Sequence, residues 1–196
     1  MVKPKELNHC LINAALAGHA ERVQTLLGAG ADVHAWNDRA LSSAALRGRT
    51  ETVKVLLAAG ADVHENNDYA LRYAACNDYV EIVQVLLAAD ANVHAVDEWA
   101  LRWAANNGHT ETMEVLAKHL FSPNSWRGKG RAEIEAQATA LYDEIKANSP
   151  SNPITPERLH TAGTILLDCA LTCWEQIRPP PPKLQISPLP AQARPL

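Results

Sequence analysis

The chain has 196 residues and a formal net charge of −4, with 47% hydrophobic but only 5% aromatic residues. This length allows one ordinary domain, and the composition excludes a core built mainly from aromatic side chains. The negative net charge argues against a protein that coats nucleic acid or an acidic membrane. The sequence has no apolar run of about 18 residues and no apolar stretch near its start, so we expect neither a membrane span nor a signal peptide.

A 30-residue repeat fills most of the first 120 residues. The segments LSSAALRGRTETVKVLLAA, from Leu41, and LRYAACNDYVEIVQVLLAA, from Leu71, align without insertions, and further copies begin at Leu11 and Leu101. Apolar residues at helical spacing predict two short helices in each copy. One such pair cannot bury its own apolar face, so we expect the copies to stack, with paired alanines allowing close approach.

Local signals mark the first helix of each repeat. The side-chain oxygens predicted to cap its start belong to Asn37, Asn67 and Asp97. The acids predicted in its first turn are Asp38, Asp68 and Glu98. The glycines predicted to end it are Gly18, Gly48 and Gly108. Arg72 and Arg102 follow two of the acids by one helical turn, an order that favours surface ion pairs, although an arginine beside a ring can also recognise an acidic partner.

The strings LLAAGADVHA, from Leu56, and NGHTETMEVL, from Asn107, resemble the ankyrin repeat. The resemblance covers roughly residues 7–120 and implies repeats at about 7–35, 36–65, 66–95 and 96–120. The family's usual period is about 33 residues with a TPLH opening, whereas this chain opens its copies with RAL, YAL or WAL. It is similar to the shorter-fingered ankyrin variety of some large viral and bacterial proteins, so we expect tight turns where longer repeats project fingers.

Two longer helices are predicted after a turn-rich linker at residues 121–130. Residues 131–147 and 156–177 each present one apolar face, and Thr155 with Pro156 marks the start of the second helix. A helical hairpin over residues 131–177 fits a cap on the open end of the solenoid better than an independent domain. The Pro-rich segment 178–196 is predicted to be extended or disordered. The expected fold class is therefore an all-α ankyrin-type solenoid of four short repeats with a C-terminal helical-hairpin cap.

Aromatic residues accumulate at two positions of the first helix toward the C-terminal repeats. The positions read His9, Arg39, Tyr69, Trp99 and Asn13, Ser43, Tyr73, Trp103. The resemblance implies a partner against this helix and its turns, and exposed aromatic residues are common anchors of interfaces. The alternative is that the rings fill space left by the missing fingers. The candidate partner-binding residues are Trp36, Arg39, Arg47, Tyr69, Arg72, Tyr73, Asn77, Trp99, Arg102, Trp103, Asn106 and Asn107.

Neither the histidines nor the cysteines have the spacing of a metal site. Stacked repeats hold His34, His64 and His94 roughly 8–10 Å apart, too far to share a zinc ion, so we predict hydrogen bonds between successive loops for them. Cys169 and Cys173 have no second ligand pair nearby and are expected to be buried. We expect no metal and no cofactor, and cysteines without a disulfide pattern favour a cytoplasmic location.

The function expected from the resemblance is non-enzymatic binding of a partner protein, as an adaptor or a stoichiometric inhibitor. No catalytic motif is present. The viral and bacterial relatives make a host-directed or toxin-neutralising role possible, with the host cytoplasm as location if the protein is viral or leaves its cell by a non-classical route. Two alternatives stay open: a regulatory or enzymatic activity in the helical hairpin, and weak nucleic-acid binding through Arg127, Lys129 and Arg131.

Overall fold

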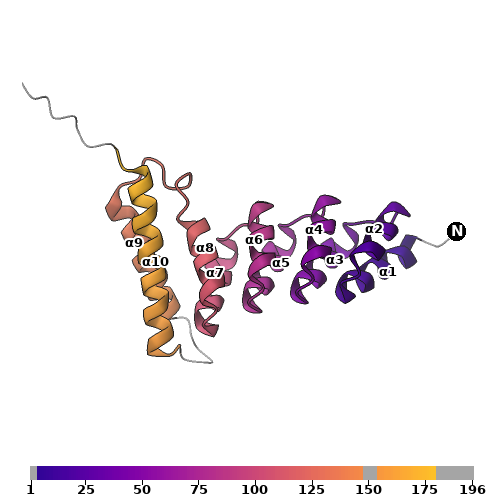
Figure 1. Cartoon of the computed structure of the whole chain (residues 1–196), viewed down its shortest axis with the longest axis horizontal. Helices are drawn as coiled ribbons and strands as arrows, with labels where there is room; N and C mark the ends of the chain where they lie inside the picture. Colours follow the sequence, from indigo (N-terminus) through magenta and orange to yellow (C-terminus); the bar gives the residue numbers. More distant parts are fainter. Residues whose placement is uncertain (1–3, 148–153, 180–196) are drawn as a thin grey trace, which may run out of the picture.

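The computed structural model of the chain describes residues 4–147 and 154–179. Within these residues every regular element is a helix, and the helices follow one another along an elongated stack (Figure 1). Their bounds are α1 (Pro4–Ala17), α2 (Ala20–Gly28), α3 (Ala35–Leu46), α4 (Thr50–Ala58), α5 (Glu65–Cys76), α6 (Val80–Ala88), α7 (Ala95–Asn107), α8 (Thr110–Leu120), α9 (Arg131–Ala147) and α10 (Pro156–Ile177). The all-α solenoid expected from the sequence is confirmed. Most of the Pro-rich segment, residues 180–196, lies outside the described residues.

The core runs along the axis of the stack and consists mainly of leucines and small residues. The leucines that open the repeats, Leu11, Leu41, Leu71 and Leu101, are at most 1% exposed, and the paired alanines beside them are also buried. Because alanine adds only one methyl group, the first helices α1, α3, α5 and α7 pack directly against each other. The second helices α2, α4, α6 and α8 pack as a parallel row behind them. The small side chains thus set the close stacking predicted from the sequence.

Glycine ends the first helix in three of the helix pairs, as predicted. Gly18, Gly48 and Gly108 have φ of +84°, +68° and +77°, a region where a side chain is strained. A Cβ at Gly48 would also lie 2.9 Å from the ring of Tyr79, so both space and conformation require glycine there. Asp78 takes the same left-handed conformation in the third pair, with φ of 60°.

The start of the first helix differs from the prediction. Three consecutive residues at each of the three inner turns, at 36–38, 66–68 and 96–98, have left-handed backbone angles. The predicted caps Asn37, Asn67 and Asp97 lie inside these turns, and no side chain caps α3, α5 or α7 at its recorded start. Asparagine and aspartate adopt this conformation more readily than other side chains, which explains their place here better than capping does. The turns are as tight as the 30-residue period predicts.

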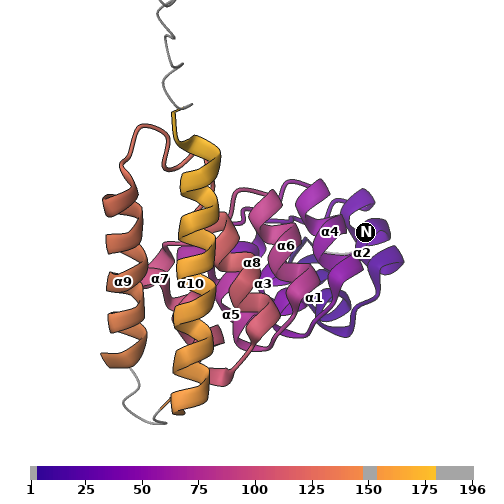
Figure 2. The same ribbon diagram turned by 60° about the vertical axis from the view of Figure 1, so that its left-hand side comes forward.

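Helices α9 and α10 form an antiparallel pair at the end of the stack (Figure 2). Helix α10 packs against α8 and α7, and α9 also contacts α7. The predicted cap at Thr155 is confirmed, since its hydroxyl accepts a hydrogen bond of 3.4 Å from the Arg158 amide. The apolar faces of both helices are buried as predicted, by Ile134, Ala138, Leu141 and Ile145 of α9 and by Ala162, Ile165, Leu166, Ala170 and Cys173 of α10. The domain boundaries stay predictions.

None of the helices in the described part of the chain is both long and apolar enough to cross a membrane.

Candidate functional site

Five aromatic residues form a partly exposed surface on the first helices and their turns. We call Trp36, Tyr69, Tyr73, Trp99 and Trp103 the aromatic face. Tyr69 stacks on Tyr73 with ring centroids 4.1 Å apart, and Trp99 stacks on Trp103 at 5.0 Å. Tyr73 lies 5.8 Å from Trp99, which joins the two pairs across the interface between α5 and α7. Trp36 stands apart, with its ring against His9 of α1 at 4.5 Å.

The rings of the aromatic face are neither fully buried nor loosely exposed. Trp36 and Trp103 are 48% and 41% exposed, while Tyr69, Tyr73 and Trp99 are half-buried. Burial is the main cause that raises the pKa of Tyr69, and its hydrogen bond with Tyr73 adds to the effect. The rings therefore pack on one another, as the space-filling interpretation expects, and still leave apolar area open to a partner.

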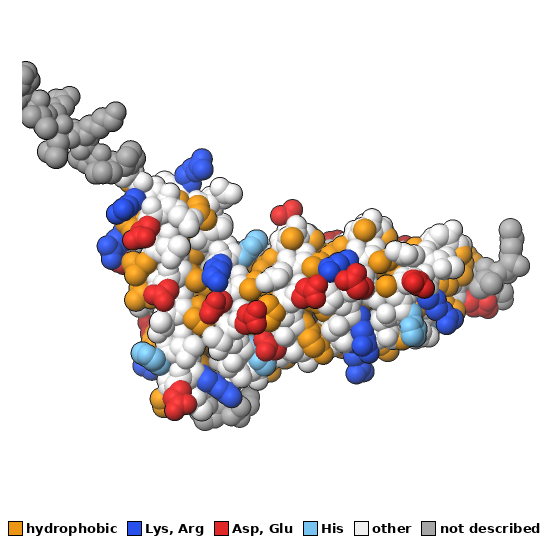
Figure 3. Space-filling view, viewed as in Figure 1, with side chains coloured by type: hydrophobic (Ala, Val, Ile, Leu, Met, Phe, Trp, Pro, Cys, Tyr) orange, Lys and Arg blue, Asp and Glu red, His pale blue; other side chains and the backbone are white. Residues whose placement is uncertain are grey.

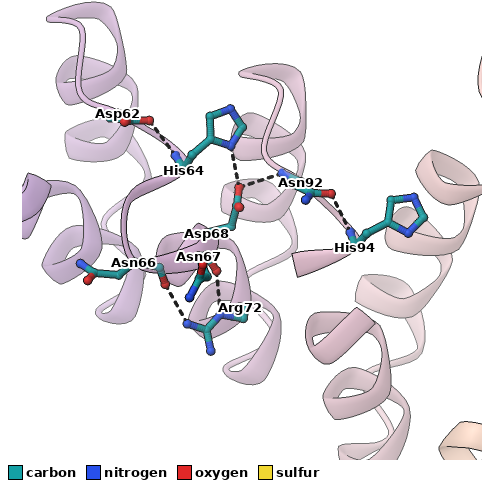
Figure 4. Close-up of polar contacts among 8 residues, drawn as sticks. All are labelled: Asp62, His64, Asn66, Asn67, Asp68, Arg72, Asn92 and His94. Atoms are coloured by element: carbon teal, nitrogen blue, oxygen red, sulfur yellow. Dashed lines mark hydrogen bonds and ion pairs between the residues drawn. The ribbon is translucent and has the colours of Figure 1, made fainter. Parts of the chain in front are cut away.

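The arginines do not form the predicted surface pairs with the acid one turn earlier. Arg72 instead donates from Nε to the Asn67 carbonyl at 2.9 Å and from Nη2 to the Asn66 carbonyl at 3.0 Å (Figure 4). The left-handed turn brings both carbonyls within reach of the guanidinium. The side chain of Asp68 is buried and does not pair with Arg72. The same guanidinium carbon lies 5.7 Å from the Tyr69 ring centroid and 5.5 Å from that of Trp99, within the range of cation–π contacts.

Arg102 also contacts groups other than the acid one turn earlier, and one of these groups belongs to the hairpin. Its Nη2 donates to the Val96 carbonyl at 3.3 Å, and its Nη1 lies 4.0 Å from a carboxylate oxygen of Glu144 in α9. In the next turn of α7, the Asn106 carbonyl accepts a 2.9 Å hydrogen bond from Arg158 of α10. These two predicted contact residues therefore lie where α7 meets the hairpin, and they are only half-exposed.

The remaining predicted residues differ in how firmly they are held. Arg39 and Arg47 are exposed, and their guanidinium groups have no hydrogen bond or ion pair with any residue that the structure describes. Asn77 and Asn107 donate from their side chains to the carbonyls of Tyr73 and Trp103, at 2.7 and 2.9 Å. These local bonds fix both amides beside the aromatic face and leave their oxygens available.

Comparison with known families matches residues 11–97 to ankyrin repeats, in three copies. Residues 11–97 of the chain are thus ankyrin repeats. No curated protein matches it. The family match ends near the start of α7, so the count of four repeats stays a prediction, although the α7–α8 pair packs on α5 and α6 as the earlier pairs pack on each other. Ankyrin repeats are generally protein–protein interaction modules and are typically not enzymes.

A ladder of hydrogen bonds joins the turns of successive ankyrin repeats, and the sequence reasoning missed it. The Oδ1 atoms of Asn8, Asp38 and Asp68 accept backbone N–H bonds of 2.8, 2.9 and 2.8 Å from Asp32, Asp62 and Asn92. Each bond spans 24 residues and joins one turn of the stack to the next turn along the chain. The available signal was an acceptor side chain at positions 8, 38, 68 and 98 in every copy.

The histidines have a different role from the predicted one. His34 approaches, through Nδ1, the carboxylate of Asp38 in its own turn at 3.2 Å, and His64 approaches that of Asp68 at 3.1 Å (Figure 4). His94 does the same with Glu98, at 2.8 Å. The carboxylates of Asp38 and Asp68, and not the imidazoles, therefore bond the next loop. No cluster of histidine, cysteine or acidic side chains in the described residues has the geometry of a metal site.

The basic connector is largely neutralised by neighbouring acids. Lys129 pairs with Glu133 at 3.2 Å, and Arg131 pairs with Glu135 at 2.7 Å. A backbone hydrogen bond from Gly130, together with Lys129, lowers the pKa of Glu133, so this carboxylate stays charged. Trp126 is turned inward, where its indole N–H donates to the Leu120 carbonyl at 3.0 Å. Of this segment, Arg127 remains as an exposed cation without a partner among the described residues.

The hairpin and α8 enclose an open cavity of about 430 Å³. Its lining includes Cys169, Cys173, Lys118 and Asp168. Burial raises the pKa of both thiols, which keeps them protonated and unreactive at neutral pH. Cys173 is buried as predicted, whereas Cys169 is only half-buried.

Proposed function

We propose that this ankyrin repeat protein is a non-enzymatic binding module that holds a partner protein against its aromatic face. The observation that carries the proposal is the continuous stack of Tyr69, Tyr73, Trp99 and Trp103 on two adjacent first helices. In this role it acts as an adaptor or as a stoichiometric inhibitor of its partner. A cytoplasmic location, and a host-directed or toxin-neutralising role, belong to the same proposal.

The packing of the rings supports binding on physical grounds. A partner that covers Trp36 or Trp103 buries a large apolar area, since nearly half of each side chain is open to solvent. The neighbouring rings already restrict Trp99 and Trp103, so little side-chain entropy is lost on binding. Tryptophan and tyrosine held in this way are the residues that most often dominate the free energy of an interface.

The two alternatives have less support. The ion pairs of Lys129 and Arg131 leave little net charge on the connector for phosphate contacts. In the hairpin, raised thiol pKa values argue against a cysteine nucleophile in the cavity beside α8. The aromatic face therefore remains the best-supported site.

Capture experiments with a matched pair of variants test the proposal. The test variant carries Trp36→Ala and Trp103→Ala, and the control carries Leu167→Ala, which removes an exposed apolar side chain of α10, outside the first helices. We expect proteins captured from cytoplasmic lysate by the wild type to be retained by the control. The test variant should bind them about tenfold or more weakly, because anchor residues of this type contribute roughly 2 kcal/mol or more.

Circular dichroism of all three proteins establishes that the variants remain folded. Equal capture by the test variant and the wild type would contradict the proposal and move the interface to another surface. A captured enzyme whose activity falls at a one-to-one ratio with the wild type identifies an inhibitor, whereas simultaneous binding of two proteins identifies an adaptor.

A further inference from the structure

The two rows of helices in the ankyrin repeats differ in their acids, although the second helices also carry the cations Arg22, Lys54 and Lys118. The helical segments 9–17, 39–47, 69–77 and 99–107 of the first helices contain no aspartate or glutamate, but they contain Arg39, Arg47, Arg72 and Arg102. The second helices carry the acids Glu21, Glu51, Glu81, Glu111 and Glu114. Lys54 bridges Glu51 and Glu81 at 2.9 Å each, which raises its pKa and ties α4 to α6. Figure 3 shows acidic side chains along the solenoid on the face that it draws, with basic side chains among them.

Three acids at the edge of the first helices are held by bonds within the turns and are not free to pair with the arginines. Asp38 and Asp68 are 3% and 4% exposed and accept bonds from the next loop, and Glu98 pairs with His94. Asp97 is exposed at its turn. In a protein with a net charge of −4, the helical segments beside the aromatic rings therefore carry arginines and no acid, and the acids Glu65 and Asp97 lie at the turns before them.

Two of the cations are open to a ligand and a third is held in place. Arg39 lies near the start of α3 and Arg47 directly follows its last residue, and both are exposed. Arg39 also lines a shallow depression of about 390 Å³ with His9, Ile12, Asn13 and Trp36. Arg72 is fixed over two rings and bonds turn carbonyls through Nε and Nη2, which leaves Nη1 for a carboxylate. A charge-assisted bond from a guanidinium is stronger than a neutral one and favours carboxylates.

We infer that the partner presents an extended acidic segment to this face, a conclusion that rests on the proposed function and adds the chemistry of its ligand. Its carboxylates meet Arg39, Arg47 and Arg72, and its apolar side chains pack on the aromatic face and in the depression beside Trp36. Neighbouring helices lie roughly 8–10 Å apart and an extended chain rises about 3.3 Å per residue, so roughly three residues cross each repeat. About ten residues reach from α1 to α7.

Two other occupants fit the charges less well. The Pro-rich segment of the chain itself, residues 178–196, contains two arginines and a lysine but no acid, so a basic face does not favour it. A single-stranded nucleic acid also stacks on aromatic rings, but the acids of the second helices and the net negative charge oppose the long-range approach of a polyphosphate. The experiment includes both as competing outcomes.

A random 12-residue peptide library displayed on phage, selected on the full chain, tests the inference. The test variant is Arg39→Gln/Arg47→Gln, and the control, Arg22→Gln/Lys118→Gln, removes the same charge from the second helices. We expect peptides selected on the wild type to be enriched in aspartate and glutamate. As synthetic peptides they should bind the test variant about tenfold more weakly, bind the control unchanged, and weaken with added salt.

The outcomes separate this inference from the proposed function. Peptides without an excess of acids, or acidic peptides that bind the test variant as well as the wild type, overturn the acidic ligand while the capture experiment can still support protein binding. Failure to select any peptide overturns the extended segment in the same way. Two further outcomes also overturn the inference, because they assign the face to another occupant. The first is that a fluorescent oligo-dT binds more tightly than the selected peptides. The second is that the peptides bind only after residues 178–196 have been deleted. Whether the aromatic face binds a protein is tested separately, by the capture experiment with the Trp36→Ala/Trp103→Ala variant.

Discussion

Asp68 illustrates how one buried side chain links two repeats. It is 4% exposed, and its carboxylate accepts from the Asn92 amide at 2.8 Å and lies 3.1 Å from His64 Nδ1. The Asn92 side chain in turn accepts from the His94 amide at 2.9 Å, so the bonds continue into the following turn. Asn8 performs the same task in the first repeat with an amide oxygen. The bond to the next turn therefore requires a side-chain acceptor oxygen at this distance from the backbone, and a charge on that oxygen matters less.

Replacing Asp68 tests the energetic weight of this link. We expect Asp68→Ala to lower the free energy of unfolding by about 2 kcal/mol, because the Asn92 amide loses its charged acceptor and His64 loses its contact with the same carboxylate. Asp68→Asn keeps an oxygen at the same distance along the side chain and should lose clearly less. Urea denaturation followed by circular dichroism measures both.

Asp168→Ala, at an exposed position of α10, is the matched control and should change stability by no more than about 0.5 kcal/mol. If Asp68→Ala is as mild as this control, the ladder does not hold the repeats together.

At the scale of one element, the inner turns combine a fixed backbone with varying side chains. The first left-handed residue is Trp36, Asn66 or Val96, with φ between 52° and 54° in all three turns. Asparagine tolerates this conformation, whereas a β-branched valine is strained in it. Val96 is also 44% exposed, so packing offers it little compensation. The turn around Val96 is therefore the most strained of the three.

Val96→Asn should relieve that strain. We expect the variant to gain about 1 kcal/mol in unfolding free energy, since it places the residue of the preceding repeat in the same conformation. Thermal denaturation at matched concentration shows the gain as a higher Tm. Val96→Ile keeps the branched Cβ and serves as control, with no gain expected; a loss of stability in Val96→Asn would show that the side chain packs against something essential.

At the scale of the whole molecule, the hairpin completes the stack instead of standing beside it. The α9–α10 pair covers the side of α7 and α8 that would otherwise be the open end of the solenoid. Arg158 reaches across to Asn106, and a Cβ at Gly108 would lie 2.9 Å from the same arginine side chain. Two predicted contact residues, Arg102 and Asn106, are partly used by this junction, so the hairpin also limits the partner surface at that end.

Destabilising the hairpin core should expose the last repeat if the hairpin is a cap. Leu166 is 1% exposed, and Leu166→Ala should lower stability by about 2–5 kcal/mol. We expect amide hydrogen exchange to become faster in α7 and α8 as well as in α9 and α10. Leu167→Ala, one residue on and 46% exposed, is the matched control and should leave exchange unchanged. Faster exchange confined to α9 and α10 would indicate an independent domain.

The sequence alone determined the helices, the repeat and the stacking core. These features depend on local signals: apolar residues at helical spacing, paired alanines, glycines such as Gly48 at the helix ends, and Thr155 before Pro156. It also placed the aromatic residues on one side of the stack, because residues four apart on a helix share a face.

Only the tertiary structure decided which polar groups meet. Asp68 does not pair with Arg72 because it accepts from the amide of Asn92, 24 residues later in the next turn, and no local pattern predicts this partner. Arg72 then bonds the carbonyls of Asn66 and Asn67, which are within its reach because three successive residues are left-handed. Such partners lie far apart in sequence, or they depend on backbone angles that the spacing of residue types does not specify. The positions of the helices were therefore predictable, whereas the hydrogen bonds between the turns were not.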